Sequence, residues 1–102
     1  MKNLIGKNWM DASDGKVIEV TNPATNEFID TVPNSSLDDV DMAVKEAIIG
    51  QKVWAKVPIH ERGKILMKFN ELVKSHRDEL AKLLSDETGK PITEAYGEID
   101  NV

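Results

Sequence analysis

The feature that most constrains the fold of this chain is a change of hydrophobic period near Ser36. Before Ser36, short runs of apolar residues alternate with turn-forming residues, and after it apolar residues recur at steps of three and four. The first pattern is typical of hairpin strands, and the second is typical of amphipathic helices. We therefore predict an α+β chain with β-hairpins over about 4–33 and three or four helices after them.

Turn residues locate the strands within the first part. The turn Gly6-Lys7-Asn8 separates two short apolar pairs, and Asn22 and Pro23 begin a polar loop between two longer apolar runs. Asn before Pro disfavours helix, and Pro fixes the backbone angle that a turn needs. A lone hairpin is only marginally stable in water. These strands must therefore pack against another part of a protein.

Capping signals locate the first helix and the third. Ser36 and Asp39 have the spacing of a capping box, and Ser75 and Asp78 repeat that spacing. In such a box each side chain accepts a hydrogen bond from the other residue's backbone N–H. Together with the apolar stripes, these signals predict helices over about 37–56, 59–74, 76–88 and 91–102.

Pro58, Gly89 and Pro91 divide the helical part of the chain. Either proline suits the first turn of a helix, and Gly89 suits the left-handed cap that ends one. The last helix is amphipathic but has no end signal before Val102. We expect that the chain was cut from a longer one, and that the last helix's apolar stripe has no partner within it. The stripe consists of Ile92, Ala95, Ile99 and Val102.

No assembled active site is visible in the residues. The chain has no cysteine, which excludes disulfides, cysteine-based zinc sites and cysteine nucleophiles. No two glycines have the spacing of a dinucleotide-binding loop. Gly89 and Lys90 superficially match the end of a phosphate-binding loop, but Leu84 stands where that loop needs its other glycine. His60 and His76 are each isolated, so they are predicted to be polar positions in first helical turns.

Charge and hydropathy narrow the class of partner and the location. The formal net charge is −5, and an acidic surface repels nucleic-acid phosphates. No apolar run is long enough to span a membrane, and the first residues lack the apolar stretch of a signal peptide. We therefore predict no nucleic-acid partner, no membrane partner and a cytoplasmic location.

The order of several short motifs is more informative than any one of them. They include Ile5-Gly6-Lys7-Asn8-Trp9, Asn22-Pro23-Ala24-Thr25-Asn26-Glu27, Glu61-Arg62-Gly63-Lys64-Ile65-Leu66 and Glu87-Thr88-Gly89-Lys90-Pro91. In this order and spacing, the chain resembles the amino-terminal segment of the NAD(P)-dependent aldehyde dehydrogenase superfamily. The resemblance covers nearly the whole chain.

The resemblance implies a parent oxidoreductase that oxidises an aldehyde, such as a semialdehyde, to a carboxylic acid with NAD or NADP. Its cysteine nucleophile, general-base glutamate and nucleotide loop follow residue 102 in the family pattern. No catalytic or cofactor-binding residue is therefore assigned here, and the chain alone is expected to be inactive and to bind no NAD(P). Residues 1–102 would form an incomplete portion of the nucleotide-binding domain, without the Rossmann sheet, of a homodimeric or homotetrameric parent.

The resemblance also implies a monovalent-cation site that some family members have near this segment. The backbone carbonyl of Thr21 and the carboxylate of Glu98 match its ligands, and a further ligand would lie after Val102. The alternative interpretation is an ordinary turn carbonyl and a surface glutamate.

Two functions remain open at this point. In the first, the chain is the amino-terminal fragment of an aldehyde dehydrogenase, and its partner is the remainder of the parent enzyme or a second copy. In the second, it is a free-standing helical interaction module without catalysis. A cooperative thermal melt of the monomeric chain would favour the second function.

Overall fold

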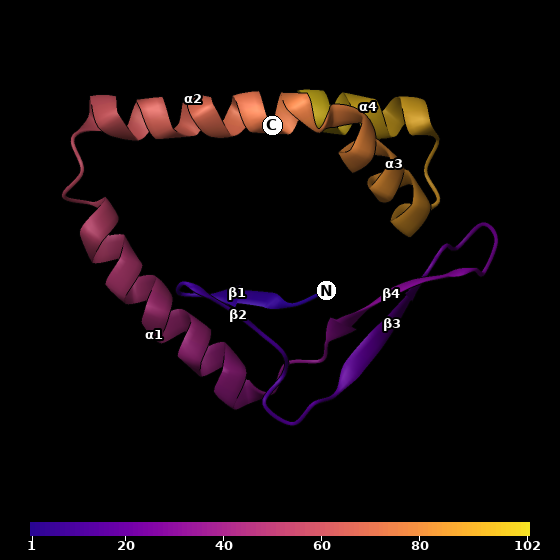
Figure 1. Cartoon of the computed structure of the whole chain (residues 1–102), viewed down its shortest axis with the longest axis horizontal. Helices are drawn as coiled ribbons and strands as arrows, with labels where there is room; N and C mark the ends of the chain where they lie inside the picture. The colour runs from indigo at the N-terminus through magenta and orange to yellow at the C-terminus, as the bar shows by residue number, and fades with distance from the viewer. The chain divides into compact units, whose positions relative to one another are not determined.

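A computed structural model describes residues 1–102, and in it four strands precede four helices (Figure 1). The strands are β1 (Asn3–Ile5), β2 (Asn8–Met10), β3 (Val17–Thr21) and β4 (Phe28–Pro33). The helices are α1 (Leu37–Trp54), α2 (Ile59–Ser75), α3 (Arg77–Thr88) and α4 (Ile92–Asp100). These elements confirm the predicted α+β class, with two antiparallel hairpins before the helices. Two compact units result: Met1–Val20 with Asp30–Pro58, and Thr21–Ile29 with Ile59–Val102.

In the first unit, the β1–β2 hairpin packs along α1 (Figure 1). The two strands are antiparallel, with Leu4 opposite Trp9 and Ile5 opposite Asn8. Gly6 has a φ of 60° in the tight turn between them, a conformation that glycine adopts without steric cost. Ile5 is buried and Trp9 is exposed, so one face of the short hairpin meets the helix while the other stays open.

The predicted capping box at the start of α1 is present. The Ser36 N–H donates to Asp39 Oδ2 at 2.8 Å, and the Asp39 N–H donates to Ser36 Oγ at 3.2 Å. A third donor was not predicted: the Ser13 N–H lies 3.1 Å from Asp39 Oδ2. Asp39 is only 4% exposed, and the backbone hydrogen bonds from Ser36 and Ser13 lower the pKa of its carboxyl. Asp39 thus fixes both the helix start and the loop after β2.

In the second unit, α3 packs against α4, and α2 contacts both (Figure 1). Ala81 of α3 and Ala95 of α4 are completely buried, because short side chains allow the two helices to approach closely. The expectation that the stripe of α4 has no partner within the chain is therefore wrong for Ala95. Ile99 is half-buried, and Ile92 and Val102 are 40% and 55% exposed.

The second predicted capping box, between Ser75 and Asp78, is wrong. The hydroxyl of Ser75 donates to the backbone carbonyl of Leu72 at 2.8 Å, because Ser75 is still the last residue of α2. The residue that caps α3 is His76, and no side-chain hydrogen bond caps this end. The break between the two helices is nevertheless where the sequence predicts it, and α3 ends at Gly89 as expected.

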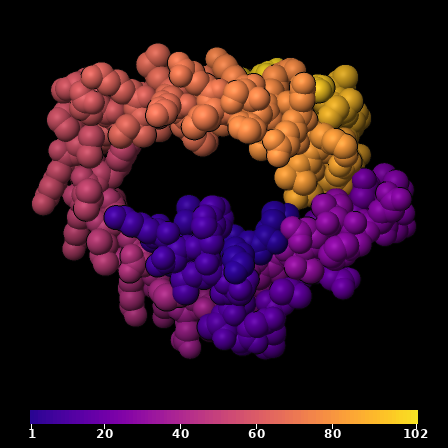
Figure 2. Space-filling view, in the orientation of Figure 1, coloured from indigo at the N-terminus to yellow at the C-terminus, as the bar shows by residue number.

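Little of the chain's apolar surface is covered. The accessible surface is 7866 Å², against about 5,800 Å² for a compact monomer of this mass. The buried hydrophobic residues are Ile5, Ala12, Ala81 and Ala95. Figure 2 shows that α3 and α4 form one cluster while the first half of α2 extends past it. None of the helices combines the length and the apolar content that crossing a bilayer needs.

Candidate functional site

The loop between β3 and β4 packs against the end of α3 in the second unit. Asn22 organises this loop: its Oδ1 accepts from the Ala24 N–H at 2.9 Å, and its N–H donates to the Glu27 carbonyl at 2.9 Å. Gly89 has a φ of 72°, and a Cβ placed there would lie 2.9 Å from Pro23 Cγ. The position therefore excludes side chains both by its backbone conformation and by this close approach. Two of the motifs that carry the family resemblance meet here.

Lys90, the residue after Gly89, makes contacts through both its side chain and its backbone. Its Nζ forms an ion pair with Glu98 Oε1 of α4, and its carbonyl accepts from Ser85 Oγ at 2.7 Å. Lys90 is the more buried partner, with 24% of its side chain exposed against 55% for Glu98. These contacts connect the end of α3 to the last turn of α4.

The structure places both predicted cation ligands in the second unit. Thr21 is the last residue of β3, immediately before the loop, and Glu98 lies in α4. The Glu98 carboxylate is already neutralised by Lys90, and the chain has no cluster of three His, Cys, Asp or Glu that could hold a metal ion. The residues present do not form a ligand shell, and the cation site at Thr21 and Glu98 stays a prediction.

No catalytic group or dinucleotide site is assembled from these residues. His60 and His76 are exposed, and each lies beside a glutamate of its own helix, Glu61 and Glu79 respectively. The two sheets are separate two-stranded hairpins, whereas a dinucleotide binds at the ends of parallel strands, on a glycine-rich turn. The strands of this chain therefore do not form a sheet of that kind, and the absence of NAD(P) binding by the chain alone stays a prediction.

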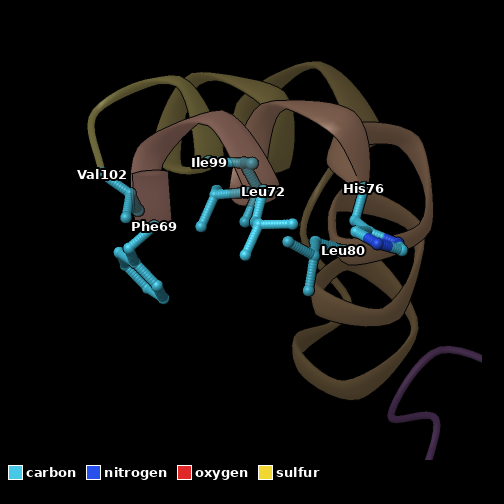
Figure 3. Close-up of a pocket in the computed structure, with 7 residues that line it drawn as sticks. Phe69, Leu72, His76, Leu80, Ile99 and Val102 are labelled. Carbon is cyan, nitrogen blue, oxygen red and sulfur yellow. The ribbon is translucent and has the colours of Figure 1, made fainter. Parts of the chain in front are cut away.

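An apolar groove lies where α2, α3 and α4 converge (Figure 3). It encloses about 410 Å³, and in Figure 3 side chains from all three helices border the same open space. The sequence predicted each helix's apolar stripe but not their convergence, since periodicity gives no crossing geometry. The groove is lined by Phe69, Leu72, Val73, His76, Leu80, Ile99 and Val102.

Known sequences match this chain along nearly its whole length. Malonate-semialdehyde dehydrogenase 2 of Geobacillus kaustophilus is 43% identical over 99 residues, which are 97% of this chain and 20% of that enzyme. Malonate-semialdehyde dehydrogenase of Bacillus pumilus is 42% identical over 99 residues and has the same coverage. The chain thus spans about a fifth of the length of the curated relatives it matches.

Solved structures contain the same arrangement of elements. An NADP-dependent enzyme of E. coli superposes with a TM-score of 0.94 at 37% identity, over 97% of this chain and 21% of that one. Succinate-semialdehyde dehydrogenase of Burkholderia pseudomallei gives 0.89 at 37% identity, over 93% and 20%. NADP-dependent glyceraldehyde-3-phosphate dehydrogenase of Bacillus halodurans C-125, complexed with NADP, gives 0.89 at 28% identity, over 93% and 20%.

A sequence profile agrees with both comparisons. The profile of the aldehyde dehydrogenase family matches residues 9–102, which include the Asn22–Pro23 loop, the groove and Gly89. The chain belongs to the aldehyde dehydrogenase family and corresponds to the amino-terminal region of its full-length members.

Proposed function

We propose that this chain is the amino-terminal structural segment of an NAD(P)-dependent dehydrogenase that oxidises a semialdehyde. The observation that carries the proposal is the combination of coverage and fold: 97% of the chain superposes at a TM-score of 0.94 on a fifth of an enzyme. The substrate class rests on the semialdehyde dehydrogenases among its relatives. Oxidation by NAD(P) then belongs to the four fifths of such an enzyme that this chain does not match.

The segment's own role is to provide packing surfaces in a fixed arrangement. The contact of Pro23 with Gly89 holds the β3–β4 loop on the helices, and the Arg77–Asp100 ion pair holds α3 to α4. Both contacts leave the apolar groove open, with Phe69 55% exposed and Leu72 53% exposed. Exposed apolar area of this kind marks a surface that another part of a protein covers. We propose that the remainder of the enzyme covers the apolar groove.

A segment exchange tests the proposal. The matched 99 residues of the Geobacillus kaustophilus enzyme are replaced by the corresponding residues of this chain, and the purified chimera is assayed for semialdehyde-dependent reduction of NAD(P). We expect an active chimera, because the packing surfaces are those of the family. The isolated chain, assayed in parallel, is expected to be inactive since it holds no reacting group.

The matched control is the same exchange with the segment of the Bacillus pumilus enzyme, which covers the same share of this chain. An active control together with an inactive chimera would contradict the proposed function. Activity in both supports it.

A further inference from the structure

Arg62 lies in the apolar stripe of α2. At 3.6 residues per turn, positions 62 and 69 differ by only about 20° around the helix axis and by roughly 10 Å along it. Ile65 and Leu66, which are 53% and 59% exposed, lie between them on the same face. The stripe then continues through Leu72 to the groove. The stripe therefore begins with a positive charge and continues as an apolar surface.

The other charged residues of α2 do not share this face. By the same spacing, Lys64, Glu71 and Lys74 lie about 120–180° from Arg62 around the helix axis, where charged side chains normally meet water. Lys68 lies about 120° from Arg62, at the edge of the apolar stripe. Glu61, the nearest acidic residue in sequence, is paired with Lys64 at 2.9 Å rather than with Arg62. Arg62 is thus the exception to the amphipathic pattern of this helix.

Arg62 also has no partner within the chain. The residue is half-buried, its Nε is buried, and that atom makes no hydrogen bond. The second arginine, Arg77, shows what a satisfied guanidinium looks like here, with two hydrogen bonds to Asp100. A buried N–H without an acceptor is costly, and native proteins usually supply the acceptor.

We propose that Arg62 is the charged anchor of the surface that α2 presents to the remainder of the enzyme. Its partner is a carboxylate of that remainder, located beside apolar side chains that cover Ile65, Leu66 and Phe69. This inference rests on the proposed function, because the matched full-length structures contain the part that would carry the carboxylate. Charge complementarity selects an acidic partner, and the fixed fork of arginine suits a carboxylate.

The test compares Arg62→Met with Lys68→Met in the chimera described above and in the isolated chain. Both substitutions remove one positive charge from α2, but Lys68 is exposed and lies about 120° from Arg62 around the helix axis. In the chimera, we expect Arg62→Met to lower the folding equilibrium constant in urea by at least about tenfold, since it leaves a carboxylate unpaired. Lys68→Met should leave that constant nearly unchanged. In the isolated chain, Lys68→Met should have no effect, and Arg62→Met should cause no loss, because it removes a buried N–H that has no acceptor there.

Arg62→Lys is a second variant that keeps the charge and loses the fork. We expect it to recover only part of the loss, because a lysine ammonium cannot make the two parallel hydrogen bonds of a guanidinium. Full recovery would contradict pairing through the fork.

The remaining outcomes separate the two proposals. An active chimera in which Arg62→Met and Lys68→Met behave alike overturns the role of Arg62 and leaves the proposed function standing. If Arg62→Met destabilises the chimera and the isolated chain equally, the role of Arg62 is overturned as well, because its partner would then lie within residues 1–102. Light scattering could instead show that the isolated chain forms a dimer and that Arg62→Met dissociates it. The partner of the α2 surface would then be a second copy of this chain, and the proposal would be wrong. If the Bacillus pumilus control is active, an inactive chimera that carries the unsubstituted segment of this chain contradicts the proposed function and the inference together.

Discussion

Arg77 and Asp100 connect the start of α3 to the end of α4 through two parallel hydrogen bonds. Nε lies 2.6 Å from Oδ1, and Nη2 lies 2.7 Å from Oδ2. The guanidinium also stacks over the ring of Tyr96, with its Cζ 4.1 Å from the ring centroid. Hydrogen bonding to Arg77 lowers the pKa of the Asp100 carboxyl. The last turn of α4 is therefore held by a side chain twenty-three positions earlier.

We expect Arg77→Lys to loosen that last turn without unfolding the unit. Lysine keeps the charge but loses the bidentate geometry and most of the contact with Tyr96. Amide hydrogen exchange near Asp100 should become a few-fold faster, because ion pairs that are partly exposed to water contribute modestly. Asp78→Asn is the control, because Asp78 is highly exposed and its carboxylate lies 4.0 Å from Arg77 Nη1, too far for a hydrogen bond. Equal acceleration by both variants would show that the bidentate pair has no special role.

The two serines with capping-box spacing should respond differently to alanine. Ser36→Ala removes a hydroxyl that accepts from the Asp39 N–H, and loss of such a cap costs about 1 kcal/mol. Ser75→Ala removes a hydroxyl that caps nothing, so the free energy of unfolding should change little. Urea denaturation of the chimera measures both values. A loss for Ser75→Ala as large as that for Ser36→Ala would contradict the structure of the α2–α3 break.

Two glycines of the second unit form another matched pair. Gly89→Ala places a methyl group against Pro23 and forces alanine into a left-handed backbone, which alone costs about 1–2 kcal/mol. Gly97→Ala, in open space within α4, should instead stabilise the helix by about 0.5–1 kcal/mol. Thermal melting of the two chimeras should therefore shift in opposite directions. A neutral Gly89→Ala would mean that the loop and the helix end do not meet.

The contact between Pro23 and Gly89 can be measured separately from the backbone strain. In the double variant Gly89→Ala with Pro23→Ala, the ring atom nearest the new methyl group is absent. The double variant should recover the steric part of the loss but not the part caused by the left-handed backbone. Strictly additive effects would argue against direct contact.

Acid should weaken the first unit through Asp39. Its pKa is lowered in the folded chain by hydrogen bonds from Ser36 and Ser13, so the ionised form stabilises the fold. That contribution is complete above the ordinary carboxyl value near 3.9 and is lost as the pH falls through the lowered folded value. Asp39→Asn removes this contribution, so the gap in urea midpoint between native and variant chimeras should narrow as the pH falls from about 7 to about 2.

Asp38→Asn provides the comparison, because Asp38 lies in the same helical turn but is exposed. Its substitution should produce a smaller gap than Asp39→Asn at neutral pH. A gap for Asp39→Asn that stays constant down to the lowest pH would contradict the role given to the carboxylate.

The sequence predicted those structural features that depend on residues close together in the chain. The box at Ser36, the turn at Gly6 and the left-handed cap at Gly89 each depend on a few consecutive residues, and the structure confirms them. Ser75 shows the limit of such local patterns, because a serine near a helix junction can cap the next helix or bond back to its own. The choice depends on where α2 ends, which the spacing alone does not fix.

Contacts between distant residues were not predicted. The bond from Ser13 to Asp39, the fit of Pro23 on Gly89 and the burial of Ala95 all depend on how elements pack. Periodicity identifies an apolar face but not the element that covers it. For the same reason, the sequence could not show that Arg62 lacks an acceptor while Arg77 has one.

The claim that the open apolar faces belong against the remainder of an aldehyde dehydrogenase is tested most directly by a crystal structure of the chimera. The informative quantity is the exposed fraction of Phe69 and Leu72, which are 55% and 53% in the isolated chain. We predict that residues outside the segment bury both side chains and that a carboxylate lies within hydrogen-bonding distance of Arg62. A folded chimera in which Phe69 and Leu72 keep half of their surface exposed would contradict the claim.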